Sequence, residues 1–169
     1  VMVMDTPTTQ YVRTKNNVYV AYQVFGSGSQ DLILIPGFIF HMDLQWDEPT
    51  LAQFNHELGK HFRVITFDKR GTGLSDRHGR APTFEERMED IEAVMEATGS
   101  QKAAIFANSE GGPIAILMAA TYPERITSLI LFGSFAKGNL SNNPDSHAKY
   151  QLFIDTMVDN WGKPETLEP

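Results

Sequence analysis

The 169-residue sequence contains no cysteine, which excludes disulfide bonds and thiolate-based metal or redox sites. It has no apolar run that approaches the roughly 20 residues needed to span a membrane. The N-terminal segment, VMVMDTPTTQ, lacks the basic stretch and the apolar core of a secretory signal. These absences favour a soluble, cytoplasmic protein.

Clusters of basic residues are also missing. The chain has 14 Lys and Arg against 21 Asp and Glu, a formal net charge of -7. Nucleic acids and anionic membranes select clustered positive charge, so we expect neither as a partner. A hydrophobic content of 41% with 11% aromatic residues is typical of a globular chain long enough for one well-packed domain.

Apolar runs alternate with helical patterns along the chain. Continuous apolar runs are typical of strands covered on both faces of a parallel sheet, and strand–helix alternation predicts an α/β fold with right-handed crossovers. We expect two short strands within 11–25 and further strands at 32–35, 62–67, 103–106 and 126–132, of which 32–35 and 126–132 are buried. Helices are expected at 49–58, 83–98 and 145–161, and after Ser109. Gly59 should end the first of these helices, and a Thr83–Glu86 capping box should begin the second.

Ser109 lies where a predicted strand turns into a helix. Small residues surround it, and Gly111, Gly112 and Pro113 open the apolar helix that follows. A side chain at such a turn stands above the sheet edge, beside the N–H groups and the positive dipole end of the helix. This setting suits a nucleophile whose product is negatively charged. The simpler alternative is a helix N-cap, a common role for serine.

Three loops follow three predicted strands: 36–38, 68–76 and the Ser109 turn. The carboxyl edge of an open parallel sheet is where ligands bind, so we expect these loops to meet there. The Gly71-x-Gly73 pair is not a dinucleotide fingerprint, because Asp76 occupies the third glycine position. We interpret Asp68 and Arg70 as a structural hydrogen-bonded pair.

Other polar groups have plainer interpretations. The histidines before Ser109 lack metal-ligand spacing, so no metal site is expected. His41 and Trp46 follow the 36–38 loop and either line a pocket beside it or occupy ordinary surface or packing positions. The acidic helix at 83–98 is interpreted as a solvated outer face. The histidines in question are His41, His56, His61 and His78.

Three motifs resemble the α/β-hydrolase superfamily across nearly the whole chain. The run 107–111, Ala-Asn-Ser-Glu-Gly, resembles the G-x-S-x-G nucleophile elbow, with Ala107 in place of the first glycine. The run 68–75 resembles the D-x-R-G-x-G-x-S loop. Residues 36–38 match the oxyanion loop, with Pro36 replacing histidine.

The resemblance implies an α/β-hydrolase fold, a mostly parallel sheet flanked by helices, lacking its C-terminal strands and helix in this chain. Ser109 would be the nucleophile, and the backbone N–H groups of Phe38 and Glu110 would form the oxyanion hole. No cofactor is implied. The structural loops near the site would contain Pro36, Gly37, Asp68, Arg70 and Gly111.

The rest of a catalytic triad is not evident. The family order places the acid and the histidine after Ser109, on loops that follow later strands and would lie beyond residue 169. Within the chain, the alternative is Asp145 with His147. By this resemblance, 1–136 is the N-terminal part of the hydrolase core and 137–169 begins a lid.

A narrower resemblance is to hydrolase domains joined to bacterial nucleotide cyclases, through the 67–77 loop, the Gly-Gly-Pro segment and Trp161-Gly162. The leading hypothesis is a serine hydrolase of carboxylic esters of small or lipid-like substrates, although perhydrolases and carbon–carbon hydrolases share the same serine. The alternatives are a ligand-binding regulatory module and a truncated relative without catalysis. The expected partners are an ester substrate, the remaining C-terminal part of the domain, and a cyclase domain.

Overall fold

A computed structural model describes residues 6–77, 79–136 and 144–163. The chain divides into two compact units, Val1–Ala136 and Lys137–Pro169, and each is described by itself. The described part of the second unit, 144–163, contains the helix α4 (Pro144–Asn160), close to the predicted range of 145–161. The assignment of this unit as the start of a lid stays a prediction.

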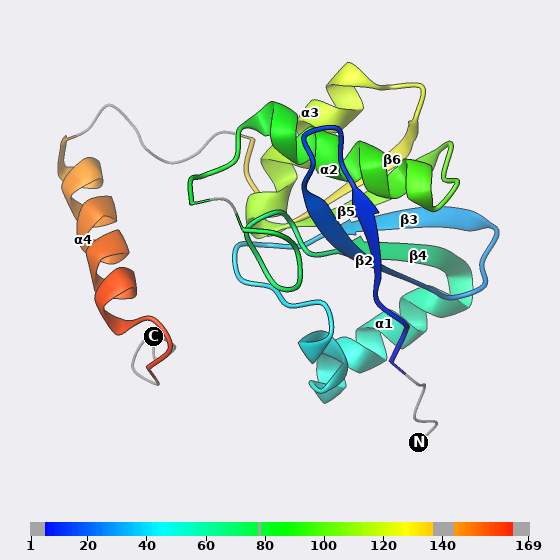
Figure 1. Cartoon of the computed structure of the whole chain (residues 1–169), viewed down its shortest axis with the longest axis horizontal. Helices are drawn as coiled ribbons and strands as arrows, with labels where there is room; N and C mark the ends of the chain where they lie inside the picture. The colour runs from blue at the N-terminus through cyan, green and yellow to red at the C-terminus, as the bar shows by residue number, and fades with distance from the viewer. Residues whose placement is uncertain (1–5, 78, 137–143, 164–169) are drawn as a thin grey trace. The chain divides into compact units, whose positions relative to one another are not determined.

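The first unit is built on a six-stranded sheet of order β1-β2-β4-β3-β5-β6 (Figure 1). The pairs β1–β2 and β2–β4 are antiparallel, whereas β4–β3, β3–β5 and β5–β6 are parallel. The predicted, mostly parallel α/β sheet is therefore confirmed. The strands are β1 (Gln10–Arg13), β2 (Tyr19–Phe25), β3 (Gln30–Ile35), β4 (Phe62–Phe67), β5 (Ala103–Asn108) and β6 (Ile126–Phe132).

Helices cover both faces of this sheet. Helices α2 (Phe84–Ala97) and α3 (Gly112–Thr121) lie on one face, and α1 (Pro49–His61) lies on the other (Figure 1). Side chains of β3 alternate between two apolar clusters: Ile33 and Ile35 pack toward α2 and α3, whereas Leu32 and Leu34 pack toward α1. Two short 3₁₀ helices, η1 (Leu44–Trp46) and η2 (Ser109–Gly111), complete the unit.

The prediction that β6 is a buried strand is wrong. Its apolar side chains are largely exposed: Ile130 is 45% and Phe132 is 64% accessible to solvent. In the described sheet, β6 pairs with β5 on one edge and has no strand on the other. An apolar run shows what a strand can bury, but burial also requires neighbours on both sides and layers on both faces.

The prediction that Gly59 ends the first helix is also wrong. Helix α1 continues to His61 and ends where Phe62 adopts an extended backbone and enters β4. Gly59 is buried, and a β carbon placed on it would lie 3.3 Å from the Cα of Gly26. The glycine therefore allows α1 to approach the turn after β2 rather than stopping the helix.

Among the described residues, none of the helices is both long enough and apolar enough to span a lipid bilayer.

Candidate functional site

Ser109 has an unusual backbone conformation. It follows the last residue of β5 directly and has a φ of +49°. Within the described part of the chain, the other non-glycine residue with positive φ is Asn17, a residue type that tolerates this region. A serine at positive φ is strained, and such strain concentrates at functional sites. The helix that follows has Gly111 as its N-cap, so Ser109 does not take the alternative role of capping α3.

The loop after β3 lies against the Ser109 turn. A β carbon placed on Gly37 would be 3.3 Å from the Cβ of Ser109, and one placed on Gly111 would be 2.7 Å from the carbonyl oxygen of Ile35. Gly111 must be glycine for this approach, because any side chain would meet backbone atoms. The structure thus brings the 36–38 loop and the Ser109 turn together at one sheet edge, with Pro36 and Gly37 buried and Phe38 59% exposed.

A buried lysine that the sequence analysis did not single out joins these loops. Lys69 is 8% exposed, and its Nζ donates hydrogen bonds of 2.5 Å to the carbonyl oxygen of Gly37 and to Oε2 of Glu110. The other carboxylate oxygen of Glu110 accepts a hydrogen bond from Arg87 of α2. Loops from three strands and one helix therefore meet in a single charged network beside Ser109.

Strand register explains why the three loops meet. Leu34 of β3 pairs with Thr66 of β4 on one side and with Phe106 of β5 on the other. Lys69 and Gly37 follow shortly after Thr66 and Leu34, so their backbones leave the sheet at the same level. The sequence holds a partial signal: Lys69 and Glu110, of opposite charge, are each the second residue after a strand.

Burial and neighbouring charges shift the pKa values of Lys69 and Glu110 in opposite directions. Burial lowers the pKa of Lys69, although the hydrogen bond and charge of Glu110 oppose this shift. Burial acts to raise the pKa of Glu110, but hydrogen bonds and charges from Lys69 and Arg87 outweigh it and lower that pKa below its ordinary value. The Glu110 carboxylate is therefore ionised and held by two cations.

The expected pairing of Asp68 with Arg70 is wrong. Asp68 instead accepts hydrogen bonds from two backbone N–H groups, those of Met42 (3.0 Å) and Leu74 (2.8 Å). Its side chain is fully buried, and burial raises its pKa. Asp68 thus fastens the loop after β4 to the segment after β3, which is structural work of the kind predicted but with different partners.

Arg70 pairs with helix α2 instead. Its Nε and Nη2 donate to the two oxygens of Asp90 at 2.7–3.0 Å, and Asp90 is 1% exposed. The interpretation of the 83–98 helix as a solvated face is therefore wrong for this side of the helix. A buried carboxylate is tolerated here because an arginine 20 positions upstream neutralises it and satisfies its oxygens.

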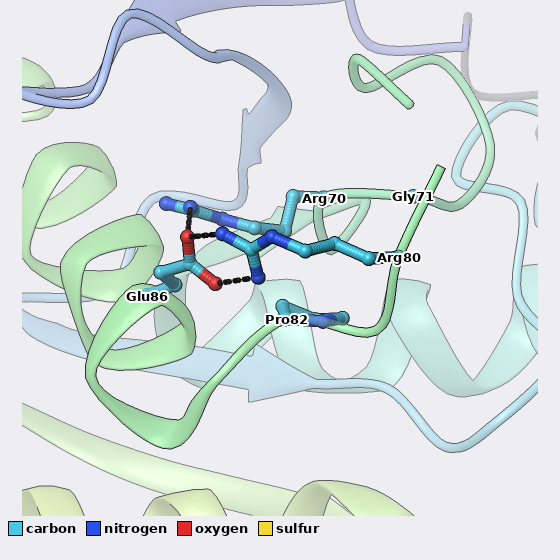
Figure 2. Close-up of a pocket in the computed structure, with 5 residues that line it drawn as sticks. All are labelled: Arg70, Gly71, Arg80, Pro82 and Glu86. Carbon is cyan, nitrogen blue, oxygen red and sulfur yellow. Dashed lines mark hydrogen bonds and ion pairs between the residues drawn. The ribbon is translucent and has the colours of Figure 1, made fainter. Parts of the chain in front are cut away.

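A small pocket beside Arg70 is an ion-pair site. Figure 2 shows Glu86 between Arg80 and Arg70, at N–O distances of 2.5 and 3.7 Å. Hydrogen bonds from Arg80 lower the pKa of Glu86 to about 2. The pocket is lined by Arg70, Gly71, Arg80, Pro82 and Glu86, so it does not include Ser109 (Figure 2).

Two residues were considered for a pocket beside the 36–38 loop: Trp46 has a packing role, and the role of His41 stays a prediction. Trp46 donates through Nε1 to Gln23 (2.9 Å), and its partly buried ring packs edge-on against Phe25 of the apolar cluster on the α1 side of the sheet, which is a packing role. His41 has a buried Nδ1 without a hydrogen-bond partner. His78 lies outside the described residues. Residues 6–77, 79–136 and 144–163 contain no cluster of three or more His, Asp or Glu suited to a metal ion.

The predicted in-chain triad stays untested. Asp145 and His147 lie in α4, in the second unit, whereas Ser109 lies in the first. What the first unit presents by itself is a strained serine between a strand and a helix N-terminus, with two loop peptides beside it. Such an arrangement can direct a hydroxyl group at an electrophile and place N–H donors around a developing negative charge.

Comparisons with known proteins agree on the family. The profile of the alpha/beta hydrolase fold family matches residues 32–163. The chain is 32% identical over 124 residues to the human serine hydrolase BPHL, covering 72% of this chain and 41% of that protein. It is 36% identical over 76 residues to a proline iminopeptidase of Xylella fastidiosa, covering 44% of this chain and 24% of that protein.

Among solved structures, an esterase from Thermogutta terrifontis superposes with a TM-score of 0.69 and 25% identity, covering 89% of this chain and 53% of that one. The chain spans about half the length or less of these relatives. The family profile covers most of the described sheet, including the 68–76 loop and the Ser109 turn. The chain belongs to the α/β-hydrolase family and has its fold.

Proposed function

We propose that this chain carries the nucleophile and the oxyanion hole of a serine hydrolase acting on carboxylic esters. Ser109 is the nucleophile, and the backbone N–H groups of Phe38 and Glu110 bind the oxyanion. The observation that carries the proposal is the left-handed conformation of Ser109 at the strand–helix turn, against which the 36–38 loop packs. The similarity to a protein named as a serine hydrolase supports it.

In the proposed reaction, Oγ of Ser109 attacks the ester carbonyl carbon while its proton passes to a general base. The carbonyl π electrons move to the oxygen, which the two N–H groups bind. The intermediate collapses, the C–O bond to the alcohol breaks, and the alcohol leaves with the proton. Water then hydrolyses the acyl-enzyme by the same steps, and serine is regenerated without a cofactor.

Apolar side chains beside the site support an ester with apolar groups. Phe38 and Ile39 are both 59% exposed, directly after the glycine that approaches Ser109. Apolar surface at the entrance of a site favours substrates that bury hydrocarbon on binding. Small or lipid-like esters fit this chemistry.

The general base is proposed to be a histidine, oriented by an acid, outside these 169 residues. The chain's coverage of 41% of its human relative supports this view. The exposed apolar side chains of β6 also support it, because further strands and helices of the domain would cover them. The remaining C-terminal part is therefore the proposed partner of this unit.

The test is labelling of the full-length translated protein with a fluorophosphonate probe. We expect labelling of the wild type and of His147→Ala, and none of Ser109→Ala. Loss of labelling in a folded His147→Ala variant would place the base in α4 instead. Equal labelling of wild type and Ser109→Ala, or no labelling of a folded wild type, would overturn the proposal.

A second candidate is hydrolysis of amide bonds, which the similarity to a proline iminopeptidase favours. Turnover of p-nitrophenyl esters against aminoacyl p-nitroanilides separates the two. The notion of a regulatory module, with or without a cyclase domain, stays a prediction; it requires a folded protein in which Ser109 binds a ligand without turnover.

A further inference from the structure

The Lys69 ammonium group makes two hydrogen bonds, and each reaches a segment that carries one of the proposed oxyanion-hole donors. One goes to the carbonyl oxygen of Gly37, at 2.5 Å. The other goes to the carboxylate of Glu110, also at 2.5 Å. Phe38 and Glu110 supply the two proposed N–H donors, so one side chain touches both donor-bearing segments.

The Gly37 contact acts on the Phe38 donor directly. The carbonyl of Gly37 and the N–H of Phe38 belong to the same peptide unit, which is planar and trans. In such a unit the C=O and N–H bonds point in opposite directions, so a group that holds the oxygen also fixes the direction of the N–H. A cation on the oxygen further polarises the peptide and makes its N–H a stronger donor.

The Glu110 contact acts on the second donor through the side chain. Lys69 and Arg87 hold the two carboxylate oxygens of Glu110, which fixes a residue in the short η2 turn. The network is partly shielded from water, since the side chains of Lys69 and Glu110 are 10% and 24% exposed. A charged hydrogen bond in such surroundings is stronger than one at the surface.

We propose that Lys69 is a positioning residue of the oxyanion hole, which aligns the N–H groups of Phe38 and Glu110 by holding the 37–38 peptide and the Glu110 carboxylate together. The inference rests on the proposed function. Lys69 touches neither the substrate nor the reacting atoms, and its effect falls on the transition state, where the oxyanion forms.

The test measures ester hydrolysis by the full-length protein and its affinity for a trifluoromethyl ketone, which forms an oxyanion on a serine nucleophile. The main variant is Lys69→Met, which keeps the length of the side chain and removes the charge. The matched control is Lys60→Met, since Lys60 is also bound to a glutamate, Glu57, at 2.6 Å but lies on the surface. Removing an oxyanion donor costs about 10²–10³ in kcat, so we expect Lys69→Met, which misaligns donors without removing them, to lower kcat about 10-fold.

The pattern of the loss separates positioning from general structure. We expect Lys69→Met to leave KM unchanged and to lower the affinity for the trifluoromethyl ketone by the same factor as kcat. Lys60→Met should match the wild type in all three quantities. A folded Lys69→Met protein with the kcat and ketone affinity of Lys60→Met would overturn the proposal. If Lys69→Met does not fold, Glu110→Gln decides, because it keeps the backbone N–H and weakens the Lys69 bond: a lower kcat at constant KM supports the proposal, and an unchanged kcat overturns it.

The same data distinguish the two levels of inference. If Ser109→Ala hydrolyses the ester as fast as the wild type, the proposed function fails. If Ser109→Ala is inactive while Lys69→Met and Lys60→Met are equally active, only the role of Lys69 fails.

Discussion

Strands β3 and β6 each contain a continuous apolar run, residues 32–35 and 129–132, yet these runs have opposite environments. Residues 32–35 of β3 are all buried, between β4 and β5 and between helices on both faces. In β6, residues 130–132 are exposed, although their composition is as apolar. Hydropathy therefore indicates that a strand can be buried, whereas its position in the sheet decides whether it is buried.

The largest expected effect tests this contrast with the same substitution in both strands. We expect Ile33→Ala to lower the free energy of unfolding by about 2–5 kcal/mol, because Ile33 is fully buried and its loss leaves a cavity. In the 169-residue chain, where Ile130 is 45% exposed, Ile130→Ala should cost about 0.5 kcal/mol or less. Urea unfolding of both variants gives the two values; equal losses would show that β6 is covered in solution.

A smaller effect is expected at the glycines near the ends of the two strands. Gly111→Ala should cost about 1–3 kcal/mol, since its β carbon would press on the carbonyl of Ile35 in β3. Gly133, directly after β6, has a φ of +55°, and a β carbon placed on it would meet no atom within 4 Å. Asparagine tolerates that conformation, so Gly133→Asn should cost well under about 1 kcal/mol. Thermal unfolding ranks the two variants; the reverse order would contradict the crowding at β3.

The smallest effect extends the contrast from apolar side chains to charges. The pKa of Glu110 is lowered in the folded protein, so its carboxylate adds stability above its unfolded pKa, near 4.5, and this stability is lost as the pH falls through the lower folded value. Glu110→Gln should therefore be less stable than the wild type at pH 7, and the gap should close below pH 4.5. The control is Glu57→Gln on the surface, where salt should remove most of the effect. A gap for Glu110→Gln that persists into acid would contradict an ionic role.

The sequence was sufficient where the signal is local. The Thr83–Glu86 capping box starts α2 as predicted, and the turn at Ser109 lies between a strand and a helix. Periodicity located each strand within a few residues. These features depend on neighbours in the chain, so they can be recognised without knowing the fold.

The sequence did not predict contacts between residues that are far apart along the chain. Lys69 meets Gly37 and Glu110 only because β3 lies between β4 and β5, an order that no local pattern states. Asp90 was predicted to lie on a solvated acidic face, because the arginine that neutralises it, Arg70, is in the loop after β4 and not in the helix. The prediction of an Asp68–Arg70 pair was wrong for the same reason. Asp68 binds the N–H of Met42 and Arg70 binds Asp90, and both partners are distant in the sequence.

The outer edge of β6 has a consequence for how the protein behaves at high concentration. A strand edge without a neighbour presents a row of free N–H and C=O groups, and natural edges are usually protected by lysine, proline or a bulge. The sequence of β6, ITSLILF, has neither lysine nor proline, and the register shift in its pairing with β5, at Ala103/Ala104, lies before the apolar run 129–132. The 169-residue chain by itself therefore presents a template for edge-to-edge association, and coverage of this edge would favour its colloidal stability.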